Sequence, residues 1–187
     1  IAFSSKRQTE PGTLTVNGQS IRTSSSVGVL GVTIDCKLTF NQHVDKVVAK
    51  CNSRLHFMRL FKQSGVQMNG LSNFYTACIR STVVYGCPAF YSILSQKCKD
   101  QLEKVQRRAS KIILPEISCY EARLAELNWQ TLNDFMAQLS YDHFLKMMCN
   151  ENHPLHNRLI FNNTARCTRK PSTFRPPVCR TELRKRS

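Results

Sequence analysis

Acidic side chains are scarce in this chain. Its 187 residues hold 12 Asp and Glu against 27 Lys and Arg, which gives a formal net charge of +15 at pH 7. Such an excess repels itself in a compact fold, but it is favourable beside a polyanion, where Lys and Arg displace counterions from phosphates. The few carboxylates form no Asp-x-Asp, Asp-Asp or His-Glu-x-x-His arrangement. The sequence therefore predicts contact with nucleic acid and no catalytic residues of its own.

Long apolar segments are also missing. No stretch approaches the roughly 20 apolar residues that span a bilayer, and residues 1–7 contain no apolar segment of signal-peptide length. The nine Cys are odd in number and widely spaced without a Cys-x-x-Cys pair, unlike a secreted disulfide scaffold. We expect an intracellular protein, nuclear and cytoplasmic, with reduced thiols and no membrane contact. Because the first residue is not Met, the chain reads as part of a longer one.

A metal site has weak support. Zinc-compatible ligand types occur in the order Cys149, His153, His156 and Cys167, but this spacing matches no common zinc finger. Asp35, after an apolar run, is a single carboxylate and cannot hold two Mg²⁺ ions for phosphoryl transfer. We expect no metal in this chain, and a strand-end or turn role for Asp35.

Hydrophobic periodicity predicts an α+β fold. Residues 14–16 alternate ahead of an Asn17-Gly18 turn signal, and the apolar run 27–34 predicts a strand buried on both faces, whose glycines indicate a bulge or a close backbone approach. Helical spacing begins at about 41, with Asn41 as the expected N-cap. Further helices are expected over about 70–83, 95–114, 118–127 and 131–149, with a break at Gly86 and Pro88 and a capping box at Thr131 and Asp134.

The composition changes after residue 150. Residues 151–187 hold nine Lys and Arg against two Glu, a net charge of +7, with four Pro and no helical period. We expect four regions: a short N-terminal β-region over 1–40, a helical region over 41–115, further helices over 116–150, and a basic, extended or partly disordered tail over 151–187.

The segment 95–114 has the clearest functional pattern. Its apolar residues form one stripe: Cys98, Leu102, Val105, Ala109, Ile112 and Ile113. Its cations gather on the opposite face: Lys97, Lys104, Arg107, Arg108 and Lys111. A face of like charges is favourable if phosphates lie along it, and an ordinary solvated face is the alternative.

Candidate nucleic-acid contacts come from three segments. The helix that begins at about residue 41 has a cation every four residues on the side away from its apolar stripe. The tail adds further cations. The complete set is Lys46, Lys50, Arg54, Lys97, Lys104, Arg107, Arg108, Lys111, Arg166, Arg169, Lys170, Arg175 and Arg180.

Several strings occur in an order that is itself informative. Residues 14–21 and 30–43 follow "L-x-x-N-G-x-x-I … L-G-V-x-I-D-x-x-L-x-F-x-x-H". Residues 75–86 contain "Y-x-A-x-I-R … Y-G", and residues 102–109 read "L-E-x-V-Q-R-R-A". In this order the strings resemble the reverse transcriptase of LINE-type (non-LTR) retrotransposons of the jockey-like group, a family of transposable-element proteins. One departure is Val27-Gly28-Val29, where the family carries Lys and an aromatic residue.

The resemblance implies a parent RNA-directed DNA polymerase. It makes residues 1–40 the end of the palm and 41–115 a thumb domain, with Leu30, Gly31 and Val32 in a primer-grip-like strand. The partners would be an RNA or DNA template–primer and the missing palm and fingers of the same polymerase. The family's Asp-Asp box, which binds Mg²⁺, would lie upstream of Ile1, so this fragment would grip nucleic acid without the catalytic aspartates. The alternative is a free-standing, domesticated RNA- or DNA-binding module. An unrecognised hydrolase would require clustered catalytic residues that the sequence does not show.

Overall fold

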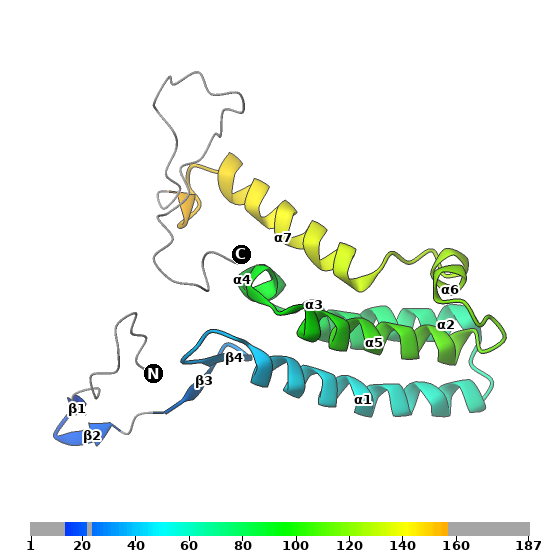
Figure 1. Cartoon of the computed structure of the whole chain (residues 1–187), viewed down its shortest axis with the longest axis horizontal. Coiled ribbons are helices and arrows are strands. Elements are labelled where there is room, and N and C mark those ends of the chain that lie inside the picture. Colours follow the sequence, from blue (N-terminus) through cyan, green and yellow to red (C-terminus); the bar gives the residue numbers. More distant parts are fainter. Residues whose placement is uncertain (1–13, 22–23, 157–187) are drawn as a thin grey trace.

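The computed structural model describes residues 14–21 and 24–156, and it is an α+β fold as predicted (Figure 1). Two small hairpins precede a set of helices, and among the described residues no strand follows β4. The strands are β1 (Leu14–Val16), β2 (Gln19–Ile21), β3 (Ser26–Val29) and β4 (Val32–Asp35). The helical elements are α1 (Asn41–Gln63), α2 (Met68–Phe74), the π-helix η1 (Tyr75–Arg80), α3 (Ser81–Val84), α4 (Cys87–Phe90), the 3₁₀ turn η2 (Tyr91–Ile93), α5 (Gln96–Ile113), α6 (Tyr120–Glu126) and α7 (Leu132–Cys149).

The predicted hairpin turn is confirmed in the first sheet. Strands β1 and β2 are antiparallel, and they are joined by Asn17 at φ 52° and Gly18 at φ 76°. Two consecutive residues with positive φ are the signature of a type I′ turn, which matches the twist of the flanking strands.

The second apolar run was predicted wrongly as one strand. It folds back on itself, so that β3 and β4 pair antiparallel around Leu30, at φ 47°, and Gly31, at φ 83°. Burial on both faces is also wrong, since Val27 and Val29 are 43% and 46% exposed. The glycine marks a tight turn here and not a bulge. Of the primer-grip-like residues, Leu30 and Gly31 therefore form the hairpin turn, and Val32 is the first residue of β4.

Asp35 closes the turn that leads into α1. Its carboxylate accepts hydrogen bonds from the backbone N–H groups of Lys37 (3.0 Å), Thr39 (3.0 Å) and Phe40 (2.8 Å). Burial alone would raise the pKa of Asp35, but these bonds together lower it. The predicted turn role is confirmed. Asn41 is not the N-cap, because Phe40 occupies that position at φ 57° without a side-chain cap.

Three helical units pack around one core. The units are α1, α5 and the continuous run α2–η1–α3, and each contacts the other two. Figure 1 shows α1 running beside α5, with α6 and α7 following α5. The apolar stripe of α1 is buried through Val44, Cys51, Leu55 and Met58, and burying each large apolar side chain contributes about 1.5–3 kcal/mol. All five predicted helices are present, and the bounds that were predicted lie within two residues of the observed ones.

The break after α3 follows from two residues. Gly86 has φ 69°, and a Cβ there would lie 3.1 Å from Val32 Cγ2, so only glycine fits both the backbone conformation and the close approach of β4. Pro88 then stands in the first turn of α4, where its missing N–H costs nothing. The sequence predicted the break but neither the short helix α4 nor the π-helical turn of η1.

Cysteine behaves here as a small apolar residue. Cys51, Cys87 and Cys98 are buried in the core, and the seven Cys within the described residues are free thiols. Burial raises the pKa of the Cys51 thiol to about 11. In the part of the chain that the structure describes, no helix is both long and apolar enough to cross a bilayer.

Candidate nucleic-acid interface

Helix α5 carries a cluster of cations on the side opposite its apolar stripe. Five residues of the predicted stripe are buried and Ile112 is partly buried; the buried ones are Cys98, Leu102, Val105, Ala109 and Ile113. All five cations of the opposite side are exposed, and together they are called the α5 basic face: Lys97, Lys104, Arg107, Arg108 and Lys111. The helix therefore anchors itself in the core while it presents five positive charges on the surface.

The two arginines of this face are held by neutral partners. Arg108 Nη1 donates a hydrogen bond to Asn52 Oδ1 of α1 at 3.0 Å. The Arg107 guanidinium lies 4.6 Å from the centroid of the Tyr120 ring, a cation–π contact. Neither contact is to an anion, although the exposed Glu121 carboxylate is within electrostatic range of Arg107.

Glu103 lies between these cations in sequence but points into the protein. It is 7% exposed, and its carboxylate accepts hydrogen bonds from Tyr120 Oη (2.5 Å) and from the backbone N–H groups of Leu132 (3.3 Å) and Asn133 (3.1 Å). The last two belong to the first turn of α7, which Thr131 also caps as predicted. Glu103 thus fastens α5 to α6 and α7.

Gln106 extends the same buried network. Its Oε1 accepts from Tyr75 Oη at 2.6 Å, and its Nε2 donates to Tyr120 Oη (3.1 Å) and to the Gln130 carbonyl (2.8 Å). Burial raises the pKa of both Tyr75 and Tyr120, so these hydroxyls stay protonated donors. Neither Glu103 nor Gln106 was predicted as a site residue from the sequence. Their signal was polar residues beside the apolar stripe at helical spacing.

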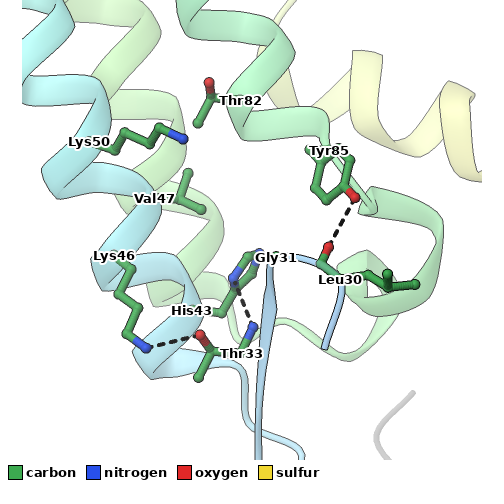
Figure 2. Close-up of a pocket in the computed structure, with 9 residues that line it drawn as sticks. All are labelled: Leu30, Gly31, Thr33, His43, Lys46, Val47, Lys50, Thr82 and Tyr85. Atoms are coloured by element: carbon green, nitrogen blue, oxygen red, sulfur yellow. Dashed lines mark hydrogen bonds between the residues drawn. The ribbon is translucent and has the colours of Figure 1, made fainter. Parts of the chain in front are cut away.

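A groove lies where the β3–β4 turn meets α1 and α3 (Figure 2). It has a volume of about 500 Å³ and is called the Lys46 groove. Its lining is Leu30, Gly31, Thr33, His43, Lys46, Val47, Lys50, Thr82 and Tyr85. The fold therefore brings the hairpin tip together with two predicted phosphate-contacting lysines, although Val32 is not part of the lining.

The groove wall is fixed by contacts between distant segments. Lys46 Nζ donates to Thr33 Oγ1 at 3.1 Å, and Tyr85 Oη donates to the Leu30 carbonyl at 2.9 Å. Figure 2 shows the Lys50 side chain directed toward Thr82. Tyr85 and Leu30 remain 56% and 86% exposed, so an aromatic ring and an apolar side chain stand at the groove beside two cations.

His43 is the buried member of this groove. It is 4% exposed, its Nδ1 accepts from the Thr33 N–H at 3.4 Å, and its Nε2 has no hydrogen-bond partner. The ring packs edge-on against Phe90, with centroids 4.9 Å apart. Burial first, and the charge of Lys46 second, lower the pKa of His43.

This shift predicts a pH dependence of stability. Because the pKa of folded His43 is depressed, its stabilisation is complete above the unfolded value of about 6.5 and is lost as the pH falls toward the folded value. We expect the free energy of unfolding to fall between pH 7 and pH 5, by at most about 1.4 kcal/mol per pH unit from this group. Urea unfolding of His43→Leu should show a weaker fall, whereas His56→Gln, on the α1 surface, should follow wild type. Equal pH profiles for all three proteins would contradict the assignment.

Arg54 has a different environment from Lys46 and Lys50. Its guanidinium Nη1 donates to the Cys78 carbonyl and to Thr82 Oγ1, which joins α1 to η1 and α3. Arg54 is half-buried, and its partner Thr82 is one of the residues that line the groove. The predicted contacts in the tail, Arg166, Arg169, Lys170, Arg175 and Arg180, lie outside the described residues, as does most of the predicted extended tail.

The predicted contacts on the helices therefore form two surfaces. Lys46 and Lys50 lie on the flank of α1 toward β4 and α3. Asn52, which holds Arg108, lies on the flank toward α5. At about 100° per residue, Lys50 and Asn52 are about 200° apart around the helix. The α5 basic face and the Lys46 groove are thus separate.

Among residues 14–21 and 24–156, no cluster of three or more His, Cys, Asp or Glu side chains could hold a metal ion. His153 Nδ1 accepts from the Leu155 N–H at 3.1 Å and His156 Nδ1 lies 3.1 Å from the Met147 carbonyl, contacts that belong to a turn. Cys167 lies outside the described residues. Comparison of the chain with protein-family models, curated proteins and solved structures gave no match.

Proposed function

We propose that this chain is the nucleic-acid-gripping, C-terminal part of a LINE-type reverse transcriptase and that it holds template–primer through backbone phosphates. The α5 basic face carries the proposal. Its five exposed cations lie opposite a largely buried apolar stripe, and the Arg108 hydrogen bond and the Arg107 cation–π contact are to neutral groups. Such a surface is favourable beside a polyanion, whose condensed counterions it displaces.

An ordinary solvated face explains this surface less well. The exposed carboxylate of α5 nearest to it, Asp100, accepts a hydrogen bond from Gln96 at 2.9 Å. Asp100 is three residues after Lys97 and four before Lys104, the spacing at which opposite charges stabilise a solvated helix face, but the face still carries five exposed cations against this one exposed carboxylate of α5. Two of the five cations are arginines, whose planar donors match the oxygens of a phosphate.

The family resemblance supports the same function. The string "L-E-x-V-Q-R-R-A" divides into two sets of residues. Leu102, Glu103, Val105 and Gln106 are buried, whereas both arginines stand on the surface. One string thus combines the anchor of α5 with its charges. The chemical step of polymerisation requires metal ions held by several carboxylates, and we assign it to residues that this sequence does not contain.

A free-standing binding module is the second candidate. It is favoured by the buried cluster that runs from Phe40 to Met136 and joins α1, α5 and α7 in one core, as an independently folding unit requires. Both candidates bind nucleic acid, and they differ in whether a palm precedes this sequence. An Asp-Asp box encoded in frame upstream of Ile1 would identify the polymerase fragment, and a start codon directly upstream would identify the module.

The purified chain tests the proposal directly. We expect it to bind an RNA–DNA template–primer with a plot of log K against log salt that is linear and steeper than roughly −4, since each neutralised phosphate contributes about −0.9. Fluorescence anisotropy between about 50 and 200 mM salt measures this slope. We expect no nucleotide incorporation with Mg²⁺. Salt-independent binding, or metal-dependent incorporation by this chain alone, would contradict the proposal.

A further inference from the structure

We infer that the chain holds two nucleic-acid segments at once, a duplex on the α5 basic face and a single strand in the Lys46 groove, and so bridges them. The inference rests on the proposed function, because both surfaces are taken to contact phosphates. It goes beyond that function in assigning the two surfaces to two different occupants.

The three helical units α1, α5 and α2–η1–α3 are joined in pairs by specific contacts. α1 joins α5 through the Arg108–Asn52 hydrogen bond and through Cys98 Sγ, 3.0 Å from Asn41 Oδ1. η1 joins α5 through Tyr75 and Gln106. α1 joins η1 and α3 through Arg54. Three units that contact one another in pairs form a triangle in cross-section.

The Lys46 groove and the α5 basic face lie on different parts of this triangle. The Lys46 groove is lined by residues of both α1 and α3, so it opens along the edge that these two units share. The α5 basic face is the outer side of the third corner, because the opposite side of α5 is buried. An edge of a triangle faces away from the opposite corner. The two surfaces therefore point in different directions.

The thickness of the helices separates the α5 basic face from the Lys46 groove. Packed helices are about 8–10 Å apart between axes, and a helix with its side chains is about 10–12 Å across. A straight duplex that lies along α5 is thus separated from the groove by the body of the protein. A segment that reaches Lys46 and Lys50 must be a second molecule or a distant part of the same one.

The two surfaces also differ in shape and in the side chains that they present. The groove has a volume of about 500 Å³, within the range of small-ligand sites, and it combines two lysines with the exposed ring of Tyr85. A basic groove beside an aromatic ring suits a single strand, with phosphates at the cations and a base against the ring. The α5 basic face is a convex helix surface without an exposed ring among its five residues, which suits the backbone of a duplex.

Energy transfer between two labelled probes tests the bridge. The probes are a short blunt DNA duplex with a donor dye and a non-complementary single-stranded oligonucleotide with an acceptor dye. We expect the full chain to produce energy transfer that rises with protein and falls when protein is in excess. Sedimentation should find one protein per pair of probes. Two proteins per pair would mean that a protein dimer brings the probes together, and this would overturn the inference.

Matched double variants separate the surfaces. Lys46→Gln with Lys50→Gln should weaken single-strand binding at least tenfold, abolish energy transfer and leave duplex affinity within twofold. Lys104→Gln with Lys111→Gln should do the reverse for the two affinities and also abolish energy transfer. If each variant weakens both probes equally, the surfaces are one site and the inference is wrong. If energy transfer persists in both, the second contact lies elsewhere and the inference is wrong. If wild type binds neither probe, the proposed function itself fails.

Discussion

Replacing Glu103 with Ala lowers the free energy of unfolding by about 3 kcal/mol or more. The substitution leaves three buried or half-buried donors without their acceptor, namely Tyr120 Oη and the N–H groups of Leu132 and Asn133. Each unsatisfied buried donor costs about 1–3 kcal/mol. Urea unfolding of the full chain measures the loss, and we expect the contacts of α6 and α7 with α5 to weaken together.

Asp100 supplies the matched control for this prediction. It is a carboxylate on the same helix, but it is exposed, and within the described residues its hydrogen bond is to the neighbouring Gln96. We expect Asp100→Ala to change the free energy of unfolding by no more than about 0.5 kcal/mol. Equal losses for the two variants would show that Glu103 does not anchor the helices in the way its hydrogen bonds indicate.

Changing Lys104, Arg107, Arg108 and Lys111 together to Gln should lower the affinity for a template–primer by about two to three orders of magnitude at about 0.1 M salt. The four side chains are exposed, so folding should change little, apart from the modest contribution of the Arg107–Tyr120 contact. Phosphate contacts carry no base information. The loss should therefore be nearly equal for duplexes of different sequence.

Binding titrations with three unrelated duplexes check this prediction. A loss confined to one sequence would assign the face to base recognition instead of backbone contact. Unchanged affinity for all three would mean that the face is merely solvated. The basic residues between 158 and 186 would then be the better candidates for the main electrostatic contact.

Local chemistry explains which parts of the fold could be predicted from the sequence. The stripe of α5, the cap at Thr131 and the break at Gly86 each depend on residues within one or two helical turns. Helical spacing, a side chain that accepts an N–H three residues later, and a glycine before a proline can all be recognised without tertiary contacts. The helix ends and the charged face followed from these signals.

Long-range contacts explain what the sequence did not show. An apolar run of eight residues is compatible with one strand or with a tight hairpin, and the turn at Leu30 and Gly31 decided between them. The Lys46 groove depends on Tyr85 reaching the Leu30 carbonyl, 55 positions away in the chain. The role of Glu103 depends on α7 beginning beside α5, where the N–H group of Asn133 reaches the Glu103 carboxylate. Helical spacing marked Glu103 as a polar residue beside the apolar stripe, but neither periodicity nor local chemistry indicates which distant segment each of these residues contacts.

Contact between the α5 basic face and phosphates is best tested by the salt dependence of binding for two charge-matched variants. Lys104→Gln with Lys111→Gln removes two exposed charges from the face, and Lys37→Gln with Lys146→Gln removes two exposed charges from other surfaces. We predict that the slope of log K against log salt becomes shallower by roughly two units for the first variant and stays at the wild-type value for the second. Equal slopes for the two variants would contradict phosphate contact by the α5 basic face, because the net charge of the chain would then determine binding.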